Sequence, residues 1–232
     1  SSNISIMTLN TPVITIDGLS SSGKSTISVL LAEELGWHLL DSGILYRSLA
    51  YLTELESVDV NSEEKIHKLM NNFKLSNTNK SNIYRVIYKN KDITDYLNTE
   101  SIGINASIIS KIRFVRDLLL PIQHSCIKEP GLIANGRDMG TIVFPKAILK
   151  IFFIADIEIR AQRRYEELLR LGEDVDFSSV LSSLKARDEA DKNRNISPME
   201  PAYDAQIVDS SELNIASVLD KILELYTISR VK

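Results

Sequence analysis

The sequence predicts an α/β protein built on a five-stranded parallel sheet with helices on both faces. Five short apolar segments recur along the chain, and stretches with helical character separate them. Strands that alternate with helices form parallel sheets, which are buried on both faces. The five predicted strands are Pro12–Asp17, 37–43, Gly131–Gly136, Leu149–Ala155 and Ala205–Ser211.

The first and last helices frame this sheet. Pro12–Asp17 is rich in β-branched residues, and the helix predicted to follow it spans Lys24–Leu35. Gly36 then supplies a typical helix stop. At the other end of the chain, Ile215–Tyr226 has an amphipathic pattern, so we expect it to close one face of the sheet.

Residues 43–130 form an insertion between the second and third strands. An interval this long exceeds what a strand-to-helix connection needs, so it must contain structure of its own. Its middle, Phe73–Leu97, predicts two or three short strands joined by Asn- and Lys-rich turns. Helical stretches near Glu63–Asn71 and Asn105–His124 flank these strands. We expect a flap with a small antiparallel sheet.

Residues 157–198 form a second, strongly charged insertion before the fifth strand. Their pattern is helical, with a break at Gly172 and a second helix that Pro198 should end, and together they predict a mobile helical lid. Residues 1–11 are polar and unpatterned, as in a disordered end. The rest is expected to be one domain, 12–232, with a core made of 12–42, 131–156 and 199–230.

The composition restricts the classes to which this chain can belong. A net charge of −4 and a pI near 5.5 argue against a surface that wraps nucleic acid, because such binding requires clustered Lys and Arg. No apolar run approaches the roughly 20 residues that span a bilayer. The only cysteine, Cys126, excludes an intramolecular disulfide, and the first residues lack signal-peptide features. We therefore expect a cytoplasmic protein without nucleic-acid or membrane partners, and separately we expect it to be a monomer.

A glycine- and serine-rich loop carries the first functional signal. Gly18–Ser25 reads GLSSSGKS, which fits G-x-x-x-x-G-K-[ST] between a predicted strand and a predicted helix. In such a loop the backbone N–H groups converge on a phosphate, Lys24 reaches the outer phosphates and Ser25 can bind Mg²⁺. The predicted triphosphate-binding residues are Gly18, Leu19, Ser20, Ser21, Ser22, Gly23, Lys24, Ser25 and Thr26.

A phosphate loop serves GTPases, motor ATPases and kinases alike, so the phosphoryl acceptor must be inferred elsewhere. A switch GTPase would carry an Asn-Lys-x-Asp segment that reads the base. The segment KNKD at Lys89–Asp92 contains these letters. It falls in a predicted hairpin turn of the insertion and does not follow a buried core strand, so the GTPase interpretation is rejected.

Polar and cationic residues follow two of the predicted strands. Ser42 stands at the end of the second strand, Tyr46 and Arg47 come directly after it, and Arg137 and Asp138 come after the third. Carboxyl ends of parallel strands lie at the edge where such folds bind ligands. A kinase for a phosphorylated acceptor needs cations there to hold a second phosphate near the first.

The lid adds two groups of charged residues at helical spacing. Their positions place each group on one face of a helix. The groups are Arg160, Arg163 and Arg164, and Arg187, Asp191 and Arg194. A solvated face with surface ion pairs is the alternative explanation. Arginines recur at three separated places that the sheet would bring to one edge, which favours a phosphate-binding site. From the residues alone, both the phosphate-binding site and the solvated face stay open.

Several longer segments resemble the bacterial cytidylate kinases, a family of P-loop nucleoside monophosphate kinases. The segments are PVITIDG, WHLLDSGILYR, PGLIANGRDMGTIVFP, ARDEADKNR and AQIVDSS. The resemblance extends from residue 12 to the final helix. It implies a three-layer P-loop kinase fold with an inserted acceptor-binding flap and a lid, and transfer of the γ-phosphoryl group of ATP, as MgATP, to CMP or dCMP.

The resemblance also implies roles for individual residues. Ser42, Tyr46 and Arg47 would contact the acceptor; Arg47, Arg137 and Arg194 would bind its phosphate; Ser107, Arg116 and Asp138 would read the pyrimidine; and Arg187 and Asp191 would lie on the ribose side. Guanidinium groups suit phosphate geometry, and a carboxylate can accept from the exocyclic amine of cytosine. The implied catalytic residues are Lys24, Arg163, Arg187 and Arg194.

Two departures from the family pattern concern Mg²⁺. Asn135 stands where the family usually has an aspartate that steers the ion through water, so this chain would act there without the charge. Ser25 stands where relatives often carry glycine, which leaves Ser25, Thr26 or both as the hydroxyl near the metal. A kinase for UMP and CMP together, a kinase for another small acceptor and a non-catalytic nucleotide-binding module remain as alternatives. Trp37 is expected to lie in the core.

Overall fold

A computed structural model of the chain describes residues 10–78 and 81–232. They form two compact units, of which the first contains residues 32–134 and the second contains 12–31 and 135–232. Most of the end expected to be disordered, residues 1–9, lies outside the described residues. The ends of the two predicted insertions, 43–130 and 157–198, do not coincide with the boundaries between these units.

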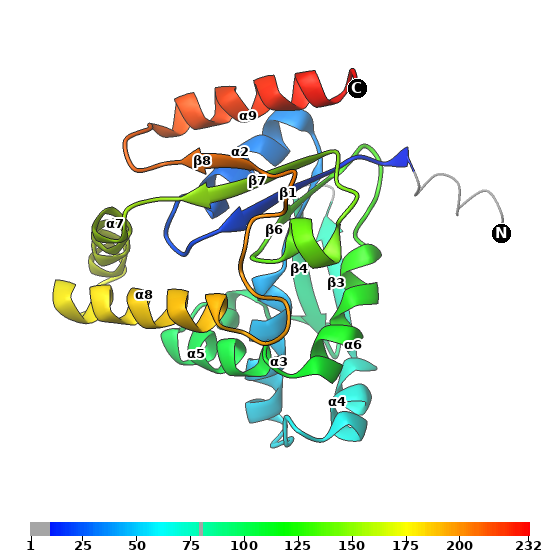
Figure 1. Cartoon of the computed structure of the whole chain (residues 1–232). Coiled ribbons are helices and arrows are strands. Elements are labelled where there is room, and N and C mark those ends of the chain that lie inside the picture. Colours follow the sequence, from blue (N-terminus) through cyan, green and yellow to red (C-terminus); the bar gives the residue numbers. More distant parts are fainter. Residues whose placement is uncertain (1–9, 79–80) are drawn as a thin grey trace. The chain divides into compact units, whose positions relative to one another are not determined.

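Parallel strands form the sheet of the second unit. Their order is β1 (Val13–Gly18), β7 (Leu149–Ile154) and β8 (Gln206–Asp209), visible at the upper left of Figure 1. Every residue of β1 is buried, as expected for a β-branched strand inside a parallel sheet. The phosphate loop leaves the carboxyl end of β1 and leads into α2 (Lys24–Leu35), which has the predicted bounds.

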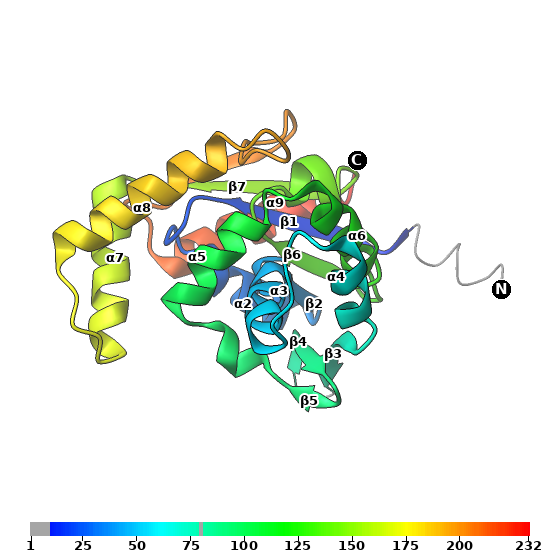
Figure 2. The same ribbon diagram turned by 90° about the horizontal axis from the view of Figure 1, so that it is seen from below.

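Helices α7 (Ile157–Arg170), α8 (Phe177–Lys192) and α9 (Ile215–Ser229) complete the second unit, with a short helical turn η2 (Met139–Val143) after the third predicted strand. In this unit α9 packs against β7. Helices α7 and α8 lie side by side in both views (Figure 2) and bury a small cluster of apolar residues between them. That cluster consists of Ala161, Leu168, Val180 and Leu184.

The end of α8 differs from the prediction. The helix stops at Lys192 with Asn193 as its C-cap, so Pro198 does not end it. Arg194 therefore lies beyond the helix, and the expectation that it shares a helical face with Arg187 and Asp191 is wrong. The chain turns instead at Ser197, which has a left-handed backbone with φ of 47°.

Strands of the first unit run in the order β3 (Phe73–Thr78), β4 (Ser81–Tyr88), β2 (His38–Asp41) and β6 (Leu132–Asn135), with β5 (Lys91–Asp92) on β4. Antiparallel pairing joins β4 to β3 and β5, as the insertion predicts. β4 also pairs in parallel with β2, where Leu39 faces Ile83. The antiparallel strands of the insertion thus continue the sheet that contains β2.

Helices α3 (Gly43–Leu55), α4 (Glu63–Met70), α5 (Glu100–Ile109) and α6 (Arg113–His124) and the turn η1 (Thr94–Leu97) surround one apolar core in the first unit. The single stretch predicted over 105–124 is in fact two helices, because α5 ends at a C-cap on Ser110. Helix α3 was not predicted, although Leu45, Leu49 and Leu52 bury one of its faces at helical spacing.

The first two residues of the KNKD segment form the turn between β4 and β5, and the last two form β5 itself. Lys89 and Asn90 both have left-handed backbones, with φ of 47° and 63°, as in a tight hairpin turn. The prediction that this segment is a hairpin turn is confirmed. Within 10–78 and 81–232, no helix has the length and apolar character needed to cross a membrane.

Candidate active site

The phosphate loop, Gly18–Ser25, is shaped by its first glycine. Gly18 has a φ of 134°, and a Cβ on it would overlap the backbone of Phe153 in β7. Only glycine permits both this conformation and this close approach. The N–H of Leu19 donates to the carbonyl of Phe153 at 3.2 Å, which ties the start of the loop to the neighbouring strand.

Three carbonyl groups of the loop are held by hydrogen bonds, one from within the loop and two from residues outside it. The Ser22 hydroxyl donates to the Leu19 carbonyl at 2.6 Å, the Arg160 guanidinium donates to the Ser20 carbonyl at 3.3 Å, and the Ser210 hydroxyl donates to the Ser22 carbonyl at 2.6 Å. In a trans peptide the C=O and the following N–H point in opposite directions. The loop therefore keeps these N–H groups available on its other side, as a phosphate-binding loop requires.

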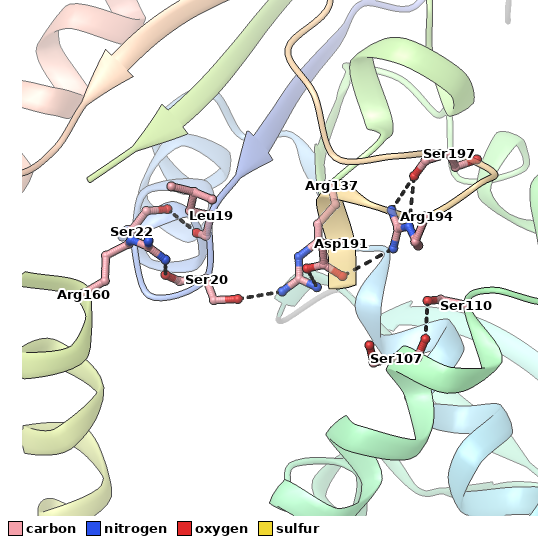
Figure 3. A network of polar contacts seen from close by, with 10 residues as sticks. All are labelled: Leu19, Ser20, Ser22, Ser107, Ser110, Arg137, Arg160, Asp191, Arg194 and Ser197. Atoms are coloured by element: carbon pink, nitrogen blue, oxygen red, sulfur yellow. Dashed lines mark hydrogen bonds and ion pairs between the residues drawn. The ribbon is translucent and has the colours of Figure 1, made fainter. Parts of the chain in front are cut away.

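Arg137 connects the loop to the segment after β6. Its guanidinium donates to the Ser20 hydroxyl at 2.8 Å and forms an ion pair with Asp191 at 2.7 Å (Figure 3). Asp191 is 2% exposed and also lies 3.6 Å from Arg194, which donates to the carbonyl of Ser197 at 3.0 Å. Three of the predicted acceptor residues, Arg137, Asp191 and Arg194, are thus brought together.

The arginines of α7 reach different partners. Arg160 is almost fully buried and pairs with Asp188 of α8 at 2.7 Å. Arg163 donates to the carbonyl of Ser210 at 2.7 Å, and Ser210 is the residue whose hydroxyl holds the Ser22 carbonyl of the loop. Arg164 forms a surface ion pair with Glu167, which is the alternative that the sequence left open. The three side chains do not form one cluster, and Arg187 lies half-buried on α8.

The predicted acceptor residues of the first unit form a separate set. Ser42 is buried and donates to Gln123 of α6 at 2.8 Å. The Arg116 guanidinium lies over the Tyr46 ring, 5.3 Å from its centroid, and donates to the Ser110 carbonyl at 2.6 Å. The Ser110 hydroxyl in turn donates to the Ser107 carbonyl at 2.7 Å. The end of α5 therefore holds the Arg116 side chain, which projects from α6.

Arg47 on α3 differs from the other arginines of its set. It is half-buried, and within the described part of the chain it makes no hydrogen bond or ion pair. A guanidinium in this position retains its full capacity to bind an anion. This observation suits the phosphate-binding role that the resemblance implies.

Asp17, at the end of β1, was missed by the sequence analysis. Its buried carboxylate accepts the N–H groups of Met139 at 2.9 Å and Gly140 at 2.8 Å, directly after Asp138. Burial raises the pKa of Asp17 to about 7, the two N–H donors and Lys24 act against this rise, and Asp138 adds to it. Asp17 thus ties the turn that carries Arg137 and Asp138 to β1. Its signal in the sequence was a single carboxylate inside an apolar strand.

Asn135 and Ser25 fit a role near a hydrated cation. The Asn135 amide lies 3.4 Å from the Ser25 hydroxyl. Its Oδ1 atom is buried, and among the described residues it has no hydrogen-bond partner. A buried acceptor without a protein partner is suited to a water molecule. Both residues therefore match the position that the resemblance implies for water-mediated Mg²⁺ binding.

A family model described as cytidylate kinase matches residues 14–228. This chain belongs to the cytidylate kinase family. It is 47% identical to the cytidylate kinase of Pseudomonas syringae pv. tomato, over 94% of this chain and 96% of that protein. It is 46% identical to the one of Pseudomonas putida, over 91% and 93%, and 43% identical to the one of Photobacterium profundum, over 91% and 93%.

Family membership confirms the resemblance drawn from the sequence motifs. The parallel strand pairs of this chain confirm the predicted α/β fold. The individual site residues stay predictions. The structure adds residues that the sequence analysis did not single out and that contact residues with predicted roles: Asp17, Asp188 and Ser210 in the second unit and Gln123 in the first.

Proposed function

We propose that this chain transfers the γ-phosphoryl group of ATP to CMP or dCMP. The observation that carries the proposal is the contact of Arg137 with both Ser20 and Asp191. It connects the loop suited to the donor phosphates with the group suited to the acceptor, inside one compact unit. The cytidylate kinases that this chain resembles support the choice of acceptor.

The residues supply position and charge without forming a covalent intermediate. The loop amides and Lys24 hold the ATP phosphates, while Arg137 and Arg194 hold the acceptor phosphate, one oxygen of which attacks in line. The guanidinium of Arg163 adds positive charge near the transferring group. Because the acceptor phosphate is already an anion, this transfer does not require a strong base.

Mg²⁺ would lower the charge repulsion between the phosphates and help to orient them. The hydroxyls of Ser25 and Thr26 and the Asn135 amide, acting through water, are the groups of this chain that would hold it. An amide hydrogen-bonds such a water without adding charge, so we infer that this chain holds Mg²⁺ less tightly than one with an aspartate here.

Recognition of the base is assigned to residues whose chemistry distinguishes cytosine from uracil. The buried Asp138 carboxylate can accept from the exocyclic amine of cytosine, which uracil lacks. Arg116 and Ser107 keep the pyrimidine-side roles that the resemblance implies. A binding site with such polar groups discriminates strongly against a base that leaves one of them unpaired.

A coupled assay of ADP release tests the proposal. With equal concentrations of CMP, dCMP, UMP and AMP, we expect turnover with CMP and dCMP and much less with the other two. Comparable rates with UMP would favour the broader kinase, and ATP binding without ADP release for any acceptor would favour a non-catalytic module. Lys24→Ala should lose turnover by about 100-fold or more, whereas Lys68→Ala, at an exposed ion pair on α4, should not.

A further inference from the structure

Arg160 lies behind the phosphate loop and contacts three separate segments. Its Nε donates to the carbonyl of Ala155 at 2.9 Å, its Nη1 donates to the carbonyl of Ser20 at 3.3 Å, and its Nη2 donates to Asp188 at 2.7 Å. Figure 3 shows it reaching the loop from α7. With a relative exposure of 3%, this side chain is positioned by the fold rather than by solvent.

The contact with Ser20 fixes the plane of one peptide bond in the loop. Because that peptide is planar and trans, holding the Ser20 carbonyl also orients the N–H of Ser21, which points away from Arg160. Ser21 has a φ of 56°, a left-handed backbone that serine rarely adopts. An unusual backbone conformation persists only where its surroundings hold it, and Arg160 is one of the groups that do so.

Asp188 keeps the Arg160 guanidinium in place. Its side chain is 13% exposed and projects from α8, so the pair links both lid helices to the loop. A guanidinium buried this deeply needs a counter-ion and hydrogen-bond acceptors, and Asp188 together with the carbonyls of Ala155 and Ser20 provides them. None of these contacts uses a group that the proposed reaction requires.

We propose that Arg160 is a positioning residue for the donor phosphates: through the Ser20 carbonyl it sets the direction of the Ser21 N–H, and Asp188 holds it there. The inference rests on the proposed function, since it assigns the loop to ATP. The proposal predicts different effects on the binding of the two substrates. Loss of Arg160 impairs binding of ATP, while binding of CMP is changed much less.

The main test measures binding of a fluorescent ATP analogue in the absence of an acceptor, together with the KM values for ATP and CMP. Arg160→Met should weaken analogue binding and raise the KM for ATP by about tenfold or more, because small misplacements of binding groups are costly. The KM for CMP should change by less than about threefold. Arg160→Lys should give an intermediate value, because an ammonium keeps the charge but cannot reach all three acceptors.

The matched control is Arg164→Met. Arg164 lies on the same helix, but its ion pair with Glu167 is exposed to solvent. This variant should bind the ATP analogue like the wild type. Equal increases in the KM values for ATP and CMP in Arg160→Met, or an unchanged affinity for the analogue, would overturn the proposal.

A double variant separates the lost contact from the unpaired charge. Arg160→Met alone leaves the Asp188 carboxylate without its partner, which destabilises the fold. Arg160→Met combined with Asp188→Leu removes both charges, so it should fold even if the single variant does not. We expect it to bind the analogue as weakly as Arg160→Met; wild-type affinity in the double variant would refute the role of the Ser20 contact. The titration needs no acceptor, so a wild type that binds ATP but does not phosphorylate CMP would contradict only the proposed function.

Discussion

The Arg137 guanidinium lies 2.7 Å from the buried carboxylate of Asp191. Two residues expected on different parts of the acceptor, its phosphate and its ribose, therefore form an ion pair with each other. The same carboxylate lies 3.6 Å from Arg194. Asp191 thus lies close to two guanidinium groups, so we expect a change at this residue to affect both arginines as well as any contact it makes with the sugar.

Asp191→Asn should weaken the binding of both acceptors. The amide keeps the shape of the side chain but removes the charge that orients Arg137 and Arg194, so the KM for dCMP should rise several-fold. The KM for CMP should rise more, by about tenfold, if the carboxylate also meets the 2′-hydroxyl. Steady-state kinetics with both acceptors measures the difference, with Asp220→Asn at an exposed position of α9 as the control. Equal increases in the two KM values would show that Asp191 does not bind the 2′-hydroxyl. An unchanged KM for dCMP would show that Asp191 does not orient the two arginines.

Asn135→Asp should lower the Mg²⁺ concentration needed for half-maximal rate. The new carboxylate would add charge next to Ser25, where Asn135 has a buried oxygen without a partner among the described residues. Without Mg²⁺ the variant should unfold at a lower temperature than the wild type, because a buried charge is costly. Thermal unfolding with and without MgATP provides this second measurement. If neither the Mg²⁺ requirement nor the melting temperature changes, Asn135 does not lie near the metal.

Asp17 should make the stability of the protein depend on pH. Its pKa is about 7 in the folded state and 3.8 when the carboxyl group is unperturbed, as in an unfolded chain, so the folded state holds an extra proton between these limits. The stabilisation is present below about pH 4 and is lost as the pH rises towards 7. Relative to Asp17→Asn, the wild type should lose at most about 1.4 kcal/mol per pH unit in this window. Urea unfolding of both proteins at pH 5, 6 and 7 tests this, and a difference that stays constant would show that Asp17 is ionised throughout.

Gly131→Ala should destabilise the first unit. A Cβ at this position would overlap the ring of Trp37, which is buried in the core as predicted. Overpacking of this kind costs about 1–3 kcal/mol. Gly103→Ala on α5 is the matched control, because its Cβ would meet no atom within 4 Å and should add helix propensity. Chemical denaturation of the two variants should therefore give changes of opposite sign.

Local patterns predicted most elements of the fold. Gly18–Ser25 and Lys24–Leu35 were recognisable because glycine spacing and helix stops act on neighbouring residues. The family was recognisable because its motifs are contiguous. The predicted end of α8 at Pro198 was wrong because a helix can stop earlier when a carbonyl of its last turn finds a partner elsewhere, and here the Asp191 carbonyl accepts from the N–H of Met199.

The sequence by itself determined the strand-and-helix pattern, the phosphate loop and the residue types available for binding anions. Only the tertiary structure decided what each arginine does: Arg160 turns inward to the loop, Arg163 meets Ser210 and Arg164 stays at the surface. The same holds for Asp17 and for the pair of Arg137 with Asp191. Helical spacing places side chains on a face, but the partner of a charged group is set by burial and by segments distant in the chain, which no local pattern encodes.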